Sequence, residues 1–203
     1  MTLLAPQIES TAQRILAAAI EEARHFGTER FTVVSVAKKA GMTHANIYRH
    51  FETKTALFDA ITLIWLKPVE TTLSEIADAP DPAHDKLERL ITALVRAYRD
   101  RVEAEPVLFD LFVSAFAESR PLARHHRARI RTLIDRVIEE GQTAGAFTVK
   151  SRDRALTFVL DGLYRFLQPE AVRADVTIAR KLLDQRLGSV LAAVLASLGA
   201  FRG

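Results

Sequence analysis

Apolar residues recur at every third or fourth position along nearly the whole chain, and no segment alternates convincingly between apolar and polar residues. Such spacing places apolar side chains on one face of an α-helix, whereas a strand needs alternation. The pattern therefore predicts an all-α protein of about nine helices. The first is expected at residues 7–26, the eighth at 151–167 and the last at 175–198, with Pro68 kinking or breaking the fourth.

Residues 32–54 carry the most informative part of this pattern. Thr32 is placed to cap a short helix at 33–40, because its hydroxyl can accept from the first backbone N–H groups. Gly41 follows directly and supplies the left-handed conformation that ends a helix. A tight turn is therefore expected after residue 41.

The second short helix has an inner apolar side and an outer polar side. Thr43 is placed to cap it, while Ile47 and Phe51 lie four residues apart on the inner side. This pattern is typical of a helix-turn-helix, which lays its second helix in the major groove of DNA. Packing within any small three-helix unit is the alternative interpretation. The outer side carries His44, Ala45, Asn46, Tyr48 and Arg49.

The same region resembles a known family. Residues 15–19 (ILAAA) and 26–60 (FGTERFTVVSVAKKAGMTHANIYRHFETKTALFDA) closely resemble the N-terminal DNA-binding domain of the TetR family of bacterial regulators. Ala45 departs from the family pattern, since many members carry glycine there, but alanine is compatible with a helix. The matching positions are Gly27, Phe31, Thr32, Val36, Ala37, Ala40, Gly41, Ile47, Tyr48, His50, Phe51, Lys54 and Leu57.

The resemblance implies a role for individual residues. It implies that His44, Asn46 and Arg49 read bases. It also implies that backbone phosphates are held by Thr32, Tyr48, His50 and Lys54. Thr43 and Ala45 belong to the same surface and complete the candidate DNA-binding set. The expected partners are double-stranded operator DNA, a small-molecule effector and a second copy of the chain.

Composition adds only mild constraints. The chain has 203 residues, of which 49% are hydrophobic, and a formal net charge of +3, so bulk charge alone does not indicate a nucleic-acid partner. Cysteine is absent, which excludes disulfides and thiolate metal sites. The N-terminus lacks signal-peptide features, and the apolar stretch 189–201 is shorter than the roughly 20 residues that span a bilayer. We expect a soluble cytoplasmic protein with no membrane partner.

Other chemical patterns are weaker. Glu22 and His25 have the Glu-x-x-His spacing of di-iron bundles, but the further ligands of such a site are missing, so a solvated helix face is favoured. His125 and His126 are adjacent in a helix and diverge, and residues 120–136 are interpreted as a solvated basic face. No nucleophile with an adjacent base emerges. We expect no catalytic residues, no metal and no cofactor.

Aromatic residues in the second part of the chain come from several helices. Ligand cavities are mostly apolar and contain a few polar groups, so aromatic residues and embedded polar ones are candidate cavity residues. Ordinary core packing is the alternative for each of them. The predicted ligand-binding residues are Thr62, Trp65, Tyr98, Phe109, Phe112, Phe116, Phe158 and Asp161.

The last two predicted helices each carry a broad apolar stripe. Two long amphipathic helices can pair with their symmetry mates to form a four-helix dimer interface. The alternative is that both stripes close the core of one protomer. The predicted interface residues are Phe158, Gly162, Phe166, Leu183, Leu187, Val190, Leu191 and Val194.

Together these expectations describe a DNA-binding domain at 1–54 and a helical ligand-binding and dimerisation domain at 55–203. The predicted function is a ligand-responsive transcriptional regulator, a repressor released by a small apolar or amphipathic molecule. Two alternatives share parts of this pattern: an architectural or activating DNA-binding protein without an effector, and a helical enzyme or carrier. A cavity filled with side chains favours the former, and the missing acid-base constellation argues against the latter.

Overall fold

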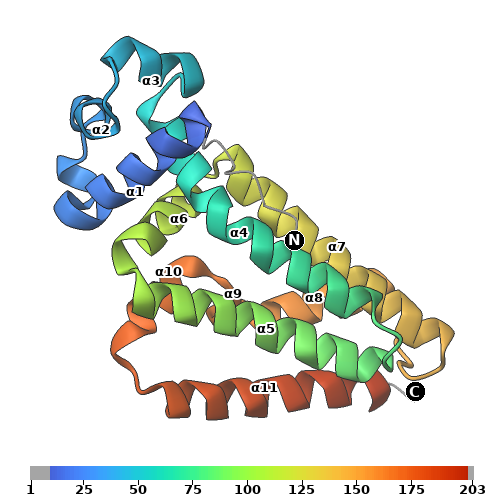
Figure 1. Ribbon diagram of the computed structural model, residues 1–203. Coiled ribbons are helices and arrows are strands. Elements are labelled where there is room, and N and C mark those ends of the chain that lie inside the picture. The colour runs from blue at the N-terminus through green and yellow to red at the C-terminus, as the bar shows by residue number, and fades with distance from the viewer. Residues whose placement is uncertain (1–9, 201–203) are drawn as a thin grey trace, which may run out of the picture.

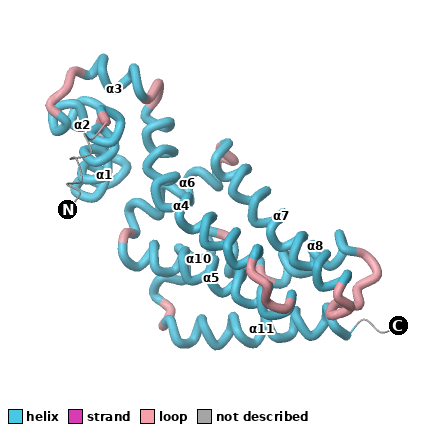
Figure 2. The backbone as a smooth tube through the Cα atoms, turned by 45° about the vertical axis from the view of Figure 1, so that its right-hand side comes forward, coloured by secondary structure: helices cyan, strands magenta, loops and turns pink. Residues whose placement is uncertain are grey.

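The computed structural model describes residues 10–200, which are helical with no strand among them (Figure 1). The all-α prediction is confirmed. Helices α1–α3 form a small unit at one end of α4, and the remaining helices form a larger bundle, as Figure 2 shows. Each connection in the bundle is short, so neighbouring helices pack closely.

The small unit consists of α1 (Thr11–Arg30), α2 (Val33–Ala40) and α3 (His44–His50). Ser10 caps α1, so the helix starts there, and the predicted start near residue 7 lies outside the described residues. Gly27, with φ 74°, interrupts α1 directly after the predicted end at residue 26. The predicted caps Thr32 and Thr43 and the left-handed Gly41, with φ 66°, are all present.

Helix α4 (Lys54–Asp78) links the two units and continues through Pro68 without a break. Its first half belongs to the core of the small unit, through Leu57 and Ile61. From Trp65 onward its buried residues belong to the core of the bundle. One continuous helix therefore contributes to both hydrophobic cores.

Helix α6 (Pro106–Ala117) also contributes to both cores. Leu108 and Leu111 pack with the small unit, whereas Phe109 and Phe112 pack in the bundle. Neighbouring residues of one short helix thus face two cores. A displacement of α4 or α6 within the bundle therefore changes the packing of the small unit, which carries α3.

Residues 10–200 form eleven α-helices and one 3-10 helix, where the sequence predicts about nine helices. Helix α11 lies at an edge of the bundle beside α5 and α8 (Figure 1). Helix α5 (Ala83–Ala104) lies between α4 and α6 in the chain. The elements after α6, apart from the 3-10 turn Asp175–Thr177, are α7 (Pro121–Thr143), α8 (Arg152–Gly162), α9 (Tyr164–Leu167), α10 (Pro169–Ala174) and α11 (Arg180–Ala200).

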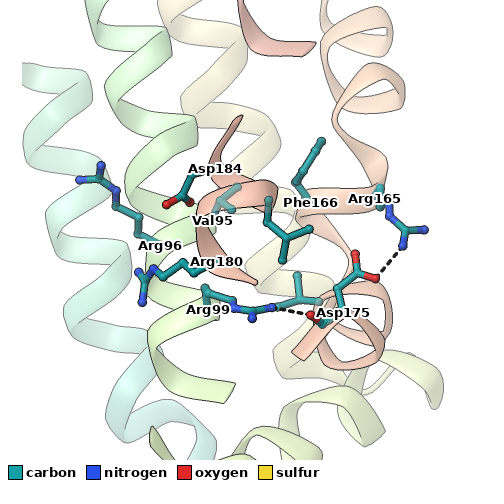
Figure 3. A pocket seen from close by; sticks show the side chains of 10 residues that line it. Val95, Arg96, Arg99, Arg165, Phe166, Asp175, Arg180 and Asp184 are labelled. Atoms are coloured by element: carbon teal, nitrogen blue, oxygen red, sulfur yellow. Dashed lines mark hydrogen bonds and ion pairs between the residues drawn. The ribbon is translucent and has the colours of Figure 1, made fainter. Parts of the chain in front are cut away.

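Two long-range contacts explain the extra elements. The guanidinium of Arg99 on α5 donates to the carbonyls of Asp175, Val176 and Ile178, and Arg165 pairs with the Asp175 carboxylate at 2.6 Å. These contacts hold the chain in a turn, so Asp175 does not cap the last helix as predicted. Figure 3 shows Arg99, Arg165 and Asp175 around a pocket of about 30 Å³. A volume of this size has room for only a few waters.

Helix α11 is exposed over much of its length. By length and composition alone, Arg180–Gly199 is apolar enough to cross a membrane, although only 28% of that window is buried inside the molecule. The expectation that no segment has this length was drawn from residues 189–201 and missed the start of the helix. An exposed apolar helix at the edge of a bundle needs a partner surface.

Candidate DNA-binding surface and ligand cavity

Helix α3 presents one buried and one exposed side. Ile47 is 1% exposed and joins the core of the small unit. His44, Ala45, Tyr48 and Arg49 are exposed, and Asn46 is half-buried. The rings of His44 and Tyr48 contact edge to face with centroids 4.7 Å apart. The helix therefore displays a polar and cationic side that nothing in residues 10–200 covers.

Two of the candidate DNA contacts also cap helices. The hydroxyl of Thr32 accepts from the backbone N–H of Ser35 at 3.1 Å, and that of Thr43 accepts from Asn46 at 3.3 Å. Both side chains are exposed at helix N-termini, where backbone dipoles favour an anion. Phosphate contact by these residues and by the exposed His50 stays a prediction.

Lys54 occupies a place that the sequence did not indicate. Its ammonium donates to the carbonyls of Phe31 at 2.8 Å and Thr28 at 3.3 Å, at the end of α1. It also lies 5.4 and 5.2 Å from the ring centroids of Phe31 and Phe58. The side chain thus ties α4 to the end of α1, whereas the sequence suggested an ammonium that projects towards a phosphate.

Most of the predicted ligand-binding residues are packed into the core of the bundle. Trp65, Phe109 and Phe112 form an aromatic cluster with Tyr98, in which the Trp65 and Phe112 ring centroids are 5.2 Å apart. The hydroxyl of Thr62 is buried and donates to the Phe58 carbonyl. These residues therefore pack in the ordinary core, which is the alternative that the sequence left open.

A cavity of about 270 Å³ lies beside this cluster, between α5, α6, α7, α8 and α9. Three predicted residues line it, namely Tyr98, Phe116 and Asp161. Its size lies near the lower end of the range for small-molecule sites. The remaining lining residues are Leu94, His126, Arg127, Ile130, Arg131, Leu160, Tyr164, Leu167 and Gln168.

Phe158 lies elsewhere, on a surface groove of about 400 Å³ between α8 and the end of α11. Its side chain is 44% exposed. This groove is lined by residues 149–151 before α8, by Arg154, Ala155 and Phe158 of α8, and by Leu198 of α11. The position of Phe158 therefore fits its predicted interface role better than its predicted ligand-binding role.

A chain of three polar side chains runs from the cavity to α4; Tyr98 and His126 are buried and line the cavity, and Glu70 is half-buried. The Tyr98 hydroxyl lies 2.6 Å from Nε2 of His126, and Nδ1 of His126 lies 2.6 Å from a carboxylate oxygen of Glu70 on α4. The hydrogen bond from His126 holds the pKa of Glu70 below its usual value, against the opposing effect of burial. Burial raises the pKa of the Tyr98 hydroxyl, which therefore stays protonated.

Sequence reasoning missed His126, which it assigned to a solvated basic face. The side chain is only 1% exposed. The signal was present in the spacing of α7, because Leu122, Ala123, Ile130 and His126 share one helical face, and the first three are buried apolar residues. Glu70, on another helix, gives no such signal.

The basic stretch on α7 is also less solvated than predicted. Arg120 is buried, pairs with Asp59 of α4 at 2.6 Å and donates to the Leu111 carbonyl at 3.0 Å. Arg129 donates to Ser74 and Arg131 to Asp153. Most of these arginines therefore connect α7 to neighbouring helices.

Within residues 10–200, no group of three or more His, Asp or Glu side chains is arranged to hold a metal ion. Glu22 is buried and His25 is exposed, so the Glu-x-x-His pair does not converge. The Tyr98–His126–Glu70 chain resembles a catalytic triad in connectivity only. The hydroxyl at its end belongs to Tyr98, a residue that is 2% exposed, so this group is buried in the protein.

The predicted interface residues separate into two groups. Leu187, Leu191 and Val194 are buried within the protomer, Leu187 being 5% exposed, and so they close its own core. A Cβ at Gly162 would lie 3.2 Å from the Val194 side chain, so this glycine allows α11 to approach α8. Phe166, Leu183 and Val190 are half-buried.

The side of α11 that faces away from the core carries other residues. Leu182 is 43% exposed. It is followed by a row of small exposed side chains, Gly188, Ser189, Ala192, Ala193 and Ala196. Small residues let another helix approach closely. The exposed side of α11 is therefore the stronger candidate for a helix-helix contact between protomers.

Two family models match the chain. The model of the bacterial regulatory proteins of the tetR family matches residues 15–61, and that of the tetracyclin repressor-like C-terminal domain matches residues 83–191. Among known proteins, the chain is 24% identical over 173 residues to nucleoid occlusion factor SlmA of Marinobacter nauticus, covering 82% of this chain and 89% of that protein.

Solved structures give the same picture of the fold. A bacterial regulatory protein of the tetR family from Rhodococcus RHA1 is 25% identical, with a TM-score of 0.61 over 94% of this chain and 97% of that one. The regulator FadR from Bacillus subtilis, in complex with stearoyl-CoA, is 18% identical, with a TM-score of 0.61 over 92% and 97% of the two chains. The architecture is thus shared over nearly the full length.

Proposed function

Because the chain belongs to the TetR family of bacterial regulatory proteins, we propose that it is a ligand-responsive transcriptional repressor. In this proposal a homodimer binds a palindromic operator and is released by a small apolar or amphipathic molecule. Residues 1–54 form the DNA-binding domain, and residues 55–203 form the domain for ligand binding and dimerisation. The protein works in the cytoplasm, where the DNA is, and is not an enzyme.

The exposed side of α3 carries the proposal for DNA binding. His44, Asn46 and Arg49 are proposed to read base edges in the major groove, as polar side chains of a recognition helix do. Thr32, Thr43, Tyr48 and His50 surround them and are proposed to hold phosphates. In a dimer the two α3 helices must lie about one DNA turn apart, about 34–36 Å, to reach successive major grooves.

The exposed sides of α8 and α11 support the proposal of a dimer. Phe158 and Leu182 are large apolar side chains left exposed there, and Gly188 leaves open space for a second helix. Paired with their copies, the two helices make a self-complementary four-helix contact about a twofold axis.

The cavity supports a response to a ligand. Its wall reaches α4 through the hydrogen bond between His126 and Glu70, and α4 leads to the small unit. A ligand that prefers one position of α4 by roughly 1–3 kcal/mol changes DNA affinity by about 5–150-fold. The structure of FadR with stearoyl-CoA supports the idea that this fold accommodates an amphipathic ligand.

The experiment is a binding titration with duplex fragments of the intergenic DNA beside the protein's own gene. Tight binding of one fragment, with an unrelated duplex of equal length bound at least 1000-fold more weakly, is expected from the usual ratio of about 10³–10⁷. Equal affinity for both duplexes at physiological salt would exclude the proposed function.

A second candidate is favoured by the similarity to SlmA, which extends over 82% of the chain. In this alternative the protein binds DNA at many chromosomal sites in nucleoid occlusion and needs no effector. Mapping of bound sites in cells distinguishes the two, because a repressor occupies a few promoters whereas a nucleoid factor occupies sites spread over the chromosome.

A further inference from the structure

The cavity between α5, α7 and α8 has a buried base and a charged rim. Tyr98, Phe116, His126 and Ile130 are buried and form the base, whereas Arg127, Arg131 and Asp161 are exposed at the rim. Both ring nitrogens of His126 are already hydrogen-bonded, to Glu70 and Tyr98. The base therefore offers a ligand an apolar surface and the remaining hydrogen-bonding capacity of one neutral hydroxyl.

The rim offers a cation. The guanidinium of Arg127 lies over the Phe116 ring, 4.4 Å from its centroid, and its one protein hydrogen bond is a long one of 3.5 Å to the Phe116 carbonyl. No carboxylate of the described chain lies within ion-pair distance of it. A guanidinium stacked on a ring keeps its in-plane N–H groups available for a carboxylate, which it binds in bidentate fashion.

The other two charges at the rim are weaker anchors. Arg131 is already paired with Asp153 at 2.9 Å. Asp161 is exposed on α8, so water screens its charge. Arg127 instead has one face covered by the buried Phe116, and a charge that is partly removed from water interacts more strongly. The cavity thus favours a negative head group over a positive one.

The hydrogen-bonded side chains of Tyr98, His126 and Glu70 connect this cavity to α4. Tyr98 belongs to α5, His126 to α7 and Glu70 to α4, and consecutive members are joined by contacts of 2.6 Å. The other charged group near Glu70 is Arg129, at 3.6 Å. A ligand atom that hydrogen-bonds to the Tyr98 hydroxyl competes with or reorients its bond to His126, and this change bears on the contact that holds α4 against α7.

Resting on the proposed function, we propose that the effector is a small amphipathic carboxylate. Its head group pairs with Arg127, its apolar body lies against Phe116 and Ile130, and its arrival is passed to α4 through Tyr98, His126 and Glu70.

The ligand class is tested with probes that differ only in charge. Binding of 3-phenylpropionate, 3-phenylpropan-1-ol and 3-phenylpropylamine is measured by calorimetry, and then that of decanoate, decan-1-ol and decylamine. In at least one series the carboxylate is expected to bind about tenfold or more tightly than the alcohol, the usual effect of a charge-assisted hydrogen bond. Arg127→Gln should remove that difference, whereas the matched variant Arg131→Gln should keep it, since Asp153 already occupies Arg131.

Three results overturn the ligand class. They are tighter binding of an amine, no binding by either carboxylate, and an unchanged carboxylate preference in Arg127→Gln. None of them depends on DNA. A failure of the proposed function would instead appear as loss of specific DNA binding by the ligand-free protein, so the two failures are distinguishable.

The coupling is tested with Glu70→Ala, with Ser74→Ala as its match. Ser74 lies one turn along α4 and also bonds to α7, through Arg129 at 2.8 Å; its hydroxyl donates to the backbone carbonyl of Glu70 but not to the Glu70 carboxylate or to His126. In the wild type, the better-binding carboxylate should lower DNA affinity by about 5–150-fold. Glu70→Ala should bind the carboxylate and DNA but lose this response, and Glu70→Gln should restore it because the amide oxygen still accepts from His126. A full response in Glu70→Ala, or a lost response in Ser74→Ala, contradicts the coupling.

Discussion

At the scale of single residues, the surface around α3 is divided between side chains that hold the fold and side chains that do not. Thr32 and Thr43 cap α2 and α3, and Lys54 closes the end of α1. Arg49 is exposed, and neither a cap nor an ion pair occupies it. Substitutions on this surface therefore separate into those that alter DNA recognition and those that also alter stability.

Arg49→Ala tests recognition. A bidentate contact from arginine to guanine O6 and N7 is worth about 1–3 kcal/mol of discrimination. The variant should be as stable as the wild type and should lose sequence preference at one position in each half-site. Titrations against a set of single-base operator variants measure this, with Arg96→Ala on the exposed side of α5 as the control. If Arg49→Ala kept the sequence preference of the wild type, the base-reading surface would have to lie elsewhere on the protein.

Lys54→Met tests the buried role of the ammonium. The substitution leaves the carbonyls of Thr28 and Phe31 without their donor, which typically costs about 1–3 kcal/mol. Urea unfolding should show this loss, while Lys39→Met, which removes a surface pair with Glu21, should change stability by less than about 1 kcal/mol. Lys54→Met could instead be fully stable and bind every DNA sequence more weakly. That result would show that Lys54 contacts a phosphate, as the family resemblance implies, and would contradict its structural role.

At the scale of elements, α11 has one side in the core of the protomer and another side that is exposed and is proposed to pair with a second copy. Leu187→Asp buries an unpaired charge and should unfold the protein, whereas Leu182→Asp places a charge on the exposed side. We expect the second variant to keep its helical content and to sediment at the 22.6 kDa of one chain, whereas the wild type sediments at twice that mass. A wild-type protein that is monomeric at micromolar concentration contradicts the proposed interface.

The helices also show which parts of the fold could be predicted from the sequence. Helices α2 to α7 were predictable because their signals are local, such as Gly41 after α2 and Pro106 and Pro121 at the starts of α6 and α7. The turn at residues 175–178, before α11, was not, because it is held by Arg99 from a distant helix. The division of the aromatic residues between core and cavity also depends on how several helices pack, and no local pattern encodes that.

At the scale of the whole molecule, two helices join the small unit, α1–α3, to the bundle. Helix α4 carries Glu70 at the cavity chain and Leu57 in the core of the small unit, and Arg120 pairs with Asp59 near the start of α4. Helix α6 places Phe116 at the cavity and Leu111 against the small unit. Ligand binding in the cavity can therefore act on α1–α3 through the packing of either α4 or α6. In a dimer, a shift of either helix would alter the separation of the two α3 helices.

The central claim is sequence-specific binding of DNA by a symmetric dimer, and selection from a random duplex library tests it most directly. The ligand-free protein should enrich an inverted repeat whose half-site centres lie about 10–10.5 base pairs apart, one helical turn. The same selection with Arg49→Ala should return a repeat that is degenerate at one position in each half. Enrichment of no sequence, or of a sequence without twofold symmetry, would contradict the account.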